Sequence, residues 1–266
     1  MRILVFDIGN TQIKAGVYDD EKLVTTWRMM TASSRTTDEH GVQLLSLLQY
    51  AGIEIQSIDR VAVSSVVPGI MHSFIGAIRR YLEKEPLVIG PGVKTGVRVK
   101  TADPKQVGAD LVCDVAATLE KYGAPALIVD FGTVTKYEVV NEKGEFVAAV
   151  FSPGIGISAN AMSEKASLLP TIEIKKPAHV LSSETVECMQ SGLVNGYIGQ
   201  VRYLIGLIKE ELNLPDLQVI ATGGFGRIMY PEVPEITHFD AQLPLEGIRL
   251  IALKNPAPKR AREDHE

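Results

Sequence analysis

Short apolar runs separated by polar turns recur in two places along the chain. Apolar or alternating runs of this length, bounded by turn residues, are typical of β-strands. Each place carries three such runs, and a polar turn joins the second run to the third. The predicted strands are residues 3–6, 13–18 and 23–29 in the first meander, and residues 126–129, 135–140 and 145–151 in the second.

The segments around the meanders alternate between helix and strand patterns. Apolar residues recur at helical spacing in residues 41–50, 71–82, 104–122, 158–166, 183–212 and 245–253. Further short strands are predicted at residues 61–66, 87–89 and 218–221. Strands that alternate with helices indicate layered α/β sheets. The last residues, 255–266, are rich in Pro and charged side chains, which predicts a disordered tail.

The two meanders resemble each other in sequence as well as in pattern. Identical residues recur at one constant spacing without a gap, in the pairs Asp7 and Asp130, Gly9 and Gly132, Val17 and Val140, and Val24 and Val147. This is a weak internal duplication. It predicts that the chain uses the same turn twice, each time at the end of a buried strand.

Composition narrows the range of partners. The chain has 266 residues, 45% of them hydrophobic and 22% charged, which suits one large or two medium globular domains. A net charge of -5 gives no general attraction for polyanions, and no apolar run approaches the roughly 20 residues that span a bilayer. We therefore expect a cytoplasmic protein that binds a small molecule, and neither nucleic acid nor a membrane. Cys113 and Cys188 show no metal-ligand spacing and are assigned no chemistry.

The turn after the first strand has the chemistry of a phosphate site. Gly9 lets the backbone turn sharply, so that its amides and the Asn10 and Thr11 side chains can point at phosphate oxygens. Lys14 adds a positive charge. The Asp7 carboxylate cannot favour phosphate directly, and we expect it to hold a hydrated divalent cation that bridges to a nucleotide. The alternative is an ordinary Gly-Asn-Thr hairpin turn.

A third glycine cluster follows the strand at residues 218–221. Residues 221–226 read Ala-Thr-Gly-Gly-Phe-Gly, which lets the backbone pack against a flat adenine or ribose, although a plain strand-to-helix loop is the alternative. The chain thus has three glycine-containing strand ends, two suited to phosphate and then one suited to a nucleoside. In this order they resemble the sequence plan of the superfamily of acetate kinases, sugar kinases, heat-shock ATPases and actin. That superfamily implies a duplicated ribonuclease H-like, or actin-like ATPase, fold of α/β type.

Several short strings sharpen the resemblance, and they fall in one order along almost the whole chain. They are DIGNT at residues 7–11, IGPGVKTG at 89–96, GAD at 108–110, DFGT at 130–133, PGIG at 153–156, MQSG at 189–192 and ATGG at 221–224. Over residues 1–254 the sequence resembles the type III pantothenate kinases. This resemblance implies transfer of the ATP γ-phosphoryl group to pantothenate, giving 4'-phosphopantothenate in the first step of coenzyme A synthesis.

The resemblance also implies cofactors and assembly. The family uses ATP with a divalent metal such as Mg²⁺, together with a monovalent cation, K⁺ or NH₄⁺. It implies two similar domains, which we place at residues 1–115 and 116–254, and a dimer. The glycine-rich helix at residues 188–212 is a candidate for the dimer contact, with an internal core helix as the alternative.

Residue roles follow from the matched strings. Asp110 matches the family's proton acceptor, Asp130 its monovalent-cation ligand, and Asp7 the divalent-metal position with ATP. The residues expected at ATP are Asp7, Ile8, Gly9, Asn10, Thr11, Gln12, Ile13, Lys14, Thr133, Gly223 and Gly224. Those expected at pantothenate are Gly108, Ala109, Asp110, Leu111 and Thr185. From the residues alone, Asp110 is better explained as an acidic first-turn helix residue, and Thr185 could equally be a helix-start residue.

The acceptor side departs from the family pattern. Leu111 stands where the family has an arginine suited to pairing with a carboxylate, and Thr101 where it has an aromatic residue. Asp114, one helical turn after Asp110, replaces a common asparagine, and two such carboxylates raise each other's proton affinity unless a cation intervenes. Lys136 replaces a small hydroxyl residue. Its ammonium either takes over from the monovalent cation near Asp130 or faces solvent on the outer side of a strand.

These departures leave three functions open. The first is an active pantothenate kinase that binds its acceptor through contacts different from those of the family. The second is a non-catalytic or complementary subunit, so that the chain forms either a homodimer or a heteromer with a homologous subunit. The third is a kinase of another small alcohol that lacks a carboxylate. Retention of Asp7, Asp110 and Asp130 argues against complete loss of catalysis.

Overall fold

The computed structural model describes residues 1–258 and divides into two compact units, which are described separately. The first unit contains Met1–Val97, Ala102–Glu120 and the described residues from Leu243 onward. The second contains Arg98–Thr101 and Lys121–Gln242. These bounds differ from a simple cut at residue 115, because the last helix returns to pack on the first sheet.

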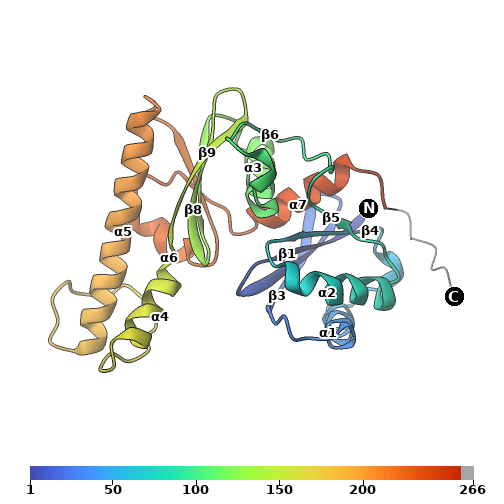
Figure 1. Ribbon diagram of the computed structural model, residues 1–266, viewed down its shortest axis with the longest axis horizontal. Coiled ribbons are helices and arrows are strands. Elements are labelled where there is room, and N and C mark those ends of the chain that lie inside the picture. Colours follow the sequence, from blue (N-terminus) through green and yellow to red (C-terminus); the bar gives the residue numbers. More distant parts are fainter. Residues whose placement is uncertain (259–266) are drawn as a thin grey trace. The chain divides into compact units, whose positions relative to one another are not determined.

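The first unit has a five-stranded sheet in the order β3-β2-β1-β4-β5 (Figure 1). Its strands are β1 (Arg2–Ile8), β2 (Gln12–Asp19), β3 (Lys22–Met30), β4 (Arg60–Ser65) and β5 (Leu87–Val88). Its helices are α1 (Thr37–Tyr50), α2 (Pro68–Tyr81), α3 (Ala109–Lys121) and α7 (Leu243–Lys254), with 3₁₀ turns η1 (Ile55–Ser57) and η2 (Pro104–Gln106). The predicted helix at residues 104–122 therefore begins as a 3₁₀ turn, and its α-helical part starts at Ala109.

Alternation along β1 assigns its side chains to two faces. Leu4, Phe6 and Ile8 join one core cluster with buried residues of α1 and α2, including an edge-to-face contact of Phe6 with Phe74 at 5.0 Å between ring centroids. The opposite face is covered by α7, which contacts β1, β2 and β4. Asp7 has the parity of this α7 face, so its carboxylate is kept out of the apolar cluster.

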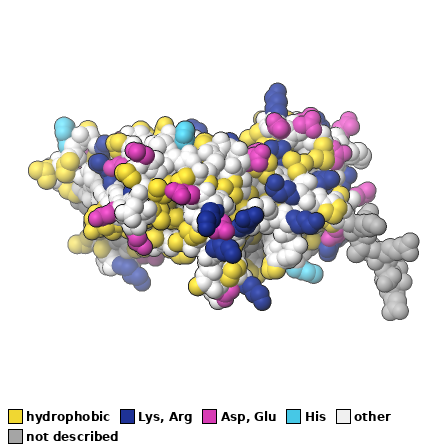
Figure 2. Space-filling view, turned by 90° about the horizontal axis from the view of Figure 1, so that it is seen from above, with side chains coloured by type: hydrophobic (Ala, Val, Ile, Leu, Met, Phe, Trp, Pro, Cys, Tyr) yellow, Lys and Arg dark blue, Asp and Glu magenta, His cyan; other side chains and the backbone are white. Residues whose placement is uncertain are grey.

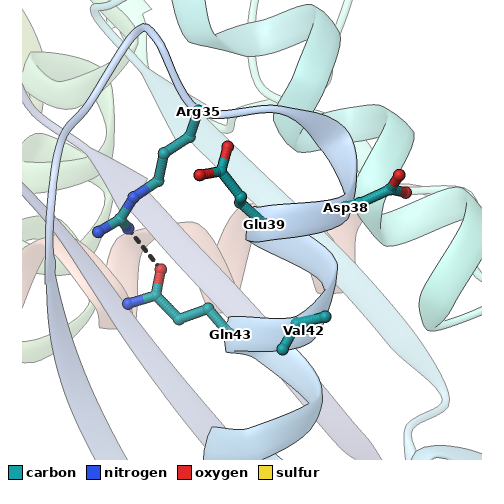
Figure 3. A pocket seen from close by; sticks show the side chains of 5 residues that line it. All are labelled: Arg35, Asp38, Glu39, Val42 and Gln43. Atoms are coloured by element: carbon teal, nitrogen blue, oxygen red, sulfur yellow. Dashed lines mark hydrogen bonds between the residues drawn. The ribbon is translucent and has the colours of Figure 1, made fainter.

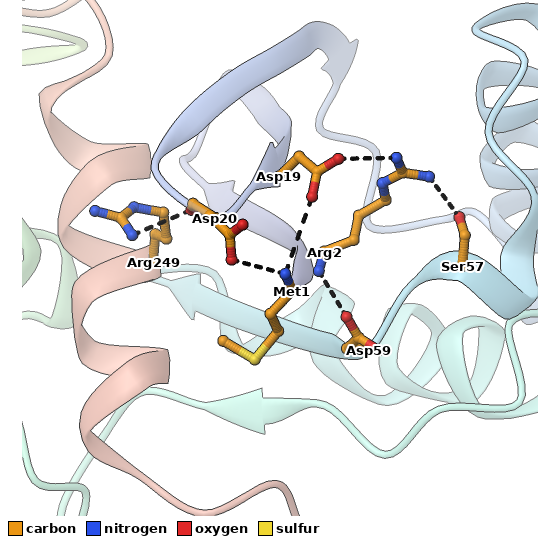
Figure 4. A network of polar contacts seen from close by, with 7 residues as sticks. All are labelled: Met1, Arg2, Asp19, Asp20, Ser57, Asp59 and Arg249. Carbon is orange, nitrogen blue, oxygen red and sulfur yellow. Dashed lines mark hydrogen bonds and ion pairs between the residues drawn. The ribbon is translucent and has the colours of Figure 1, made fainter.

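A polar network fastens α7 and the start of β1 to the turn between β2 and β3 (Figure 4). The Arg2 guanidinium donates to Asp19 Oδ2 at 3.1 Å and to Ser57 Oγ at 2.8 Å. Arg249 of α7, only 5% exposed, donates to the backbone oxygen of Asp20 at 3.2 Å. This network lies at the opposite end of β1 from Asp7, so it holds the sheet and helix together without occupying the strand end that carries the predicted phosphate turn.

Helices α3 and α7 approach each other so closely that one residue must be glycine. A Cβ placed on Gly247 would lie 1.9 Å from the backbone oxygen of Cys113. We expect Gly247→Ala to lower the free energy of unfolding by about 1–3 kcal/mol, because one of the two backbones must shift. Urea unfolding of both proteins measures this. Gly69→Ala in α2 is the control, since nothing lies within 4 Å of its added Cβ, and equal midpoints for Gly247→Ala and wild type would contradict the prediction.

The second unit has a six-stranded sheet in the order β11-β10-β7-β8-β9-β6. Its strands are β6 (Arg98–Val99), β7 (Ala126–Phe131), β8 (Val134–Val140), β9 (Glu145–Pro153), β10 (Gln218–Thr222) and β11 (His238–Phe239). Its helices are α4 (Ile155–Lys165), α5 (Thr185–Glu211) and α6 (Gly226–Met229), with a 3₁₀ turn η3 (Tyr230–Glu232). Leu127, Val129 and Phe131 of β7 form one core with α4 and α5, so Ile128 and Asp130 lie on the other face of the sheet.

Strand pairing confirms that the two meanders share one topology, and it corrects one predicted pair. Around the first turn Ile8 pairs with Ile13, whereas around the second Phe131 pairs with Thr135. The second turn is therefore one residue shorter. Leu4 pairs with Val17 and Leu127 with Val139, so the predicted equivalence of Val17 with Val140 is wrong, because the shorter turn moves every later partner by one position.

The next turn restores the spacing. Asp19 pairs with Lys22 in the first meander, but Asn141 donates its backbone N–H to Glu145 at 3.0 Å across a turn that is one residue longer. Val24 and Val147 are again equivalent, and the register shifts at each of them in the same way. Two copies that keep the same bulge support the duplication more strongly than the sequence identities do.

Asn255, near the end of the described residues, is held by hydrogen bonds. Asn255 exchanges hydrogen bonds with the backbone of Lys94 at 3.0 and 3.1 Å, so this first residue of the predicted tail is held in place. Residues 259–266 of that prediction lie outside the described residues. Within residues 1–258, no helix combines the length and apolar character needed to cross a membrane.

Candidate active site

The turn between β1 and β2 is held by its own backbone and by Thr31. Gly9 donates its N–H to Gln12 O at 3.0 Å, and Thr31 binds the far side of the turn through its hydroxyl to Gly9 O at 2.6 Å and its N–H to Thr11 O at 3.1 Å. These bonds use the carbonyls of the turn. The Asn10, Thr11 and Gln12 side chains are exposed to solvent.

Cys113 is a buried thiol of the first unit. Burial raises the pKa of Cys113 well above its usual value, and the charges of Asp7, Asp114 and Asp110 raise it further. The strand-end Asp7 and the helix residues Asp110 and Asp114 therefore all act on the same thiol. A thiol with a raised pKa is a poor nucleophile, so Cys113 is structural, in agreement with the sequence analysis.

Asp110 occupies the first turn of α3, where the helix dipole favours a negative charge. Gly108 makes room for it, since a Cβ on that glycine would lie 2.4 Å from Asp110 Oδ1. Asp114 follows one turn later and is 1% exposed, whereas Asp110 is partly exposed. Of the two carboxylates, Asp110 is therefore the one that a dissolved substrate can reach.

Leu111, predicted as a departure on the acceptor side, is a buried residue. Its side chain is 8% exposed and counts among the buried hydrophobic residues, so this position offers neither charge nor hydrogen bond to a substrate. Thr101 is half-buried in the second unit. Thr185 is the exposed first residue of α5 in the second unit, whereas Gly108, Ala109, Asp110 and Leu111 belong to the first.

Three glycine segments meet at one end of the second sheet. The turn after β7 receives the N–H of Gly154 on Thr133 O at 3.1 Å, and a Cβ on Gly154 would lie 2.4 Å from that oxygen. Gly223, with φ at +90°, lies where a Cβ would be 2.4 Å from Asp130 Oδ1. The structure thus brings Asp130, Thr133 and Gly223 together, and it adds Gly154. The signal for Gly154 was its place directly after a strand, in the string at residues 153–156.

Lys136 is not a solvent-facing residue, so that alternative is wrong. Its Nζ lies 2.8 Å from Asp130 Oδ2 and 4.0 Å from Glu138 Oε1. The side chain is 12% exposed. Asp130 and Lys136 are direct cross-strand partners in β7 and β8, which places both side chains on the same face of the sheet.

A separate pocket lies at the start of α1 in the first unit (Figure 3). It is lined by Arg35, Asp38, Glu39, Val42 and Gln43, with Arg35 donating to Gln43 Oε1 at 2.6 Å. None of these residues was predicted for the site. Glu39 is engaged in capping α1, because its carboxylate accepts the backbone N–H of Thr36 at 2.7 Å. Arg35 and Glu39 already make hydrogen bonds within this segment, so we do not assign the pocket to the candidate site.

Charged side chains of both signs share one face of the molecule. On the face seen in Figure 2, Lys and Arg side chains are interspersed with Asp and Glu. Such mixing on this face matches the modest net charge of -5 and gives no broad basic surface there for a polyanion.

Comparison with solved structures identifies the fold. The activator of 2-hydroxyisocaproyl-CoA dehydratase from Clostridium difficile, solved with bound ADPNP, aligns with a TM-score of 0.56 at 16% identity, over 95% of this chain and 94% of that one. The ethanolamine utilization protein EutJ from Carboxydothermus hydrogenoformans aligns with a TM-score of 0.55 at 15% identity, over 96% and 90%. The fold is the duplicated α/β fold of the actin-like ATPases, as predicted.

Comparison of sequences identifies the family. The family model described as type III pantothenate kinase matches residues 3–206. A type III pantothenate kinase from Agathobacter rectalis is 43% identical over 252 residues, which are 95% of this chain and 97% of that protein. The match to the family model includes the turns after β1 and β7 and the start of α3. This chain belongs to the type III pantothenate kinase family.

Proposed function

We propose that the chain transfers the γ-phosphoryl group of ATP to the hydroxyl of pantothenate, the first step of coenzyme A synthesis. The observation that carries this proposal is the match of residues 3–206 to the type III pantothenate kinase family, which includes Asp7 at the end of the strand that leads into the phosphate turn and Asp110 in the first turn of α3. The match to a pantothenate kinase over nearly the whole chain supports the substrate. The proposed compartment is the cytoplasm, which cell fractionation would test.

Asp110 is the proposed proton acceptor. In this reaction the pantothenate oxygen forms a bond to the γ-phosphorus while the bond from that phosphorus to the ADP oxygen breaks. The proton of the attacking hydroxyl passes to an oxygen of the Asp110 carboxylate. Asp110 is partly exposed and lies in the first turn of α3, so a substrate can reach its carboxylate.

Each unit carries glycine-rich turns that we propose as ATP contacts. In the first unit, the proposed phosphate contacts are the backbone of the turn at residues 9–12, its exposed side chains and Lys14. In the second unit, the turn at Thr133 is proposed to contact phosphate, and Gly223 and Gly224 to pack against the nucleoside. Gly224 has nothing within 4 Å of its added Cβ, which leaves space for a flat ligand beside the backbone.

A divalent cation fits the first unit only as part of a complex with ATP. Within residues 1–258, no group of three or more His, Cys, Asp or Glu side chains could hold a metal by itself. Mg²⁺ needs just one or two carboxylates when substrate phosphates and water complete its shell, and Asp7 supplies such a carboxylate. When bound, the cation would neutralise charge that develops on the phosphate oxygens.

A dissolved monovalent cation does not fit the second unit. The resemblance assigns that ion to Asp130, but the carboxylate already lies 2.8 Å from the Lys136 ammonium. No step of the proposed reaction is therefore assigned to a potassium or ammonium ion.

One assay tests the proposed reaction. The purified chain is incubated with ATP, Mg²⁺ and pantothenate, and 4'-phosphopantothenate is detected directly, alone and with any homologous subunit from the same genome. Panthenol, which replaces the carboxylate by a hydroxymethyl group, is the matched acceptor. Product with pantothenate supports the proposal, product in the mixed sample alone indicates a heteromer, and product with panthenol alone would replace pantothenate by a neutral alcohol.

We also propose a homodimer formed through α5. Along this helix Gly192, Gly196, Gly199, Tyr203 and Gly206 are all exposed and fall at intervals of three or four residues, which puts them on one face. Small residues allow another helix to approach closely. We expect light scattering to give twice the mass of the chain, and Gly199→Glu to give the single mass, whereas a wild-type monomer would rule the homodimer out.

A further inference from the structure

A small charged cluster lies on the face of the second sheet opposite α4 and α5. It consists of Asp130 on β7 and of Lys136 and Glu138 on β8, and we refer to it as the Asp130 cluster. The register pairs Asp130 with Lys136 and Ile128 with Glu138, so all three charged side chains share one face. The Lys136 ammonium is 2.8 Å from Asp130 Oδ2 and 4.0 Å from Glu138 Oε1.

Burial makes the ammonium necessary to the cluster. The side chains of Asp130 and Lys136 are each 12% exposed, and that of Glu138 is 0% exposed. Two carboxylates removed from water repel each other unless a positive charge stands between them. Lys136 supplies that charge from within the chain. A dissolved cation at Asp130 Oδ2 would have to displace this ammonium, which would then be buried away from its partner.

The cluster is in contact with the proposed phosphate turn of the second unit. Gly132 begins this turn, and a Cβ added to it would lie 3.4 Å from Asp130 Oδ2, the oxygen that binds Lys136. The other oxygen, Oδ1, faces Gly223. The Asp130 carboxylate therefore touches both glycine segments, and the ion pair with Lys136 fixes its orientation.

We propose that Lys136 is a built-in monovalent cation: its ammonium takes the place at Asp130 that a dissolved K⁺ or NH₄⁺ ion would take. A primary ammonium carries the same charge as either ion and binds carboxylate oxygen in the same way. Lys136 is thus a positioning residue, because it acts on the phosphate turn through Asp130. The equivalent position of the first meander also carries a lysine, Lys14, directly across from Asp7.

The test compares salts of equal ionic strength, choline chloride, KCl and NH₄Cl, for the wild type and Lys136→Ala. The rate of phosphopantothenate formation is one readout, and it rests on the proposed function. The melting temperature of the protein is the other, and it does not depend on that function. The wild type should form phosphopantothenate equally fast in all three salts. Lys136→Ala should lose about tenfold or more of its rate in choline chloride and regain it in KCl or NH₄Cl. Its melting temperature should rise with KCl concentration, whereas that of the wild type should not.

Two further variants complete the design. Lys136→Arg keeps the charge and should remain independent of the added cation. Lys143→Ala removes an exposed lysine from the turn between β8 and β9 and should behave like the wild type in every salt. If Lys136→Ala does not fold, Lys136→Gln, which keeps a hydrogen-bond donor without the charge, should show the same dependence on potassium.

The outcomes separate the inference from the kinase reaction. A wild-type rate or melting temperature that depends on added potassium would overturn the inference, and so would a folded Lys136→Ala or Lys136→Gln variant that responds to neither cation. If no protein phosphorylates pantothenate in any salt, the proposed function fails. The melting temperatures still decide whether Lys136 replaces a dissolved ion.

Discussion

Asp110→Asn should lower the rate of phosphopantothenate formation by about a thousandfold while leaving ATP affinity nearly unchanged. An amide has the shape of the carboxylate but cannot accept the hydroxyl proton as the new bond to phosphorus forms. Helix α3 should remain seated, because its close contact with Gly247 is made by the Cys113 backbone and does not involve the Asp110 side chain. Single-turnover rates and equilibrium binding of ATP to the purified variant measure the two quantities separately.

The control for this variant is Asp216→Asn, which makes the same chemical change at an exposed aspartate of the second unit. It should match the wild type in both rate and ATP binding. A near-normal rate for Asp110→Asn would remove Asp110 from the proposed mechanism. A loss of ATP binding in parallel with the rate would instead assign it to nucleotide binding.

Gly223→Ala should weaken ATP binding by about a hundredfold, since small displacements in a preorganised site have effects of this size. The added Cβ would lie 2.4 Å from Asp130 Oδ1 and 2.5 Å from the Phe131 nitrogen. Neither neighbour can yield without cost, because one is fixed by the ion pair with Lys136 and the other is backbone of β7. Isothermal titration calorimetry of the variant with ATP measures the loss of affinity.

Backbone strain alone must be separated from this clash, because Gly223 has φ at +90°. Gly123→Ala provides the comparison. Gly123 belongs to the same unit and has φ at +81°, but nothing lies within 4 Å of its added Cβ. It should lose stability by about 1 kcal/mol and keep its ATP affinity. Equal ATP affinities for the two variants would show that the contact of Gly223 with Asp130 does not shape the site.

The hydrophobic pattern predicted the elements well, and the reason is local. Alternating or helical runs of apolar residues mark each meander strand, the long α5 and the final helix. Such runs can be recognised without any distant residue. The same holds for the Asp7 and Asp130 turns, whose glycines follow their strands directly. Family strings then supplied the family, which the sequence comparisons confirm. The individual site residues remain predictions for the variants above to test.

The hydrophobic pattern did not predict the lengths of the turns. The gapless match of the two meanders paired Val17 with Val140, yet the second turn is one residue shorter and the next one longer. Because side chains alternate between faces, a shift of one residue exchanges the inner and outer positions. Only the hydrogen-bond register showed that Lys136, directly across from Asp130, is the counterpart of Lys14.

We could predict the strands, the helices, the doubled aspartate-glycine turn and the family from the sequence alone, because these depend on neighbouring residues and on short motifs that occur in the family's order. Tertiary structure alone decided that α7 belongs with the first unit, that Leu111 is buried and that Lys136 binds Asp130. A lysine followed at i+2 by a glutamate reads as a solvated strand face. Its burial depends on what pairs and packs across the sheet, and that information is spread over residues far apart in the chain.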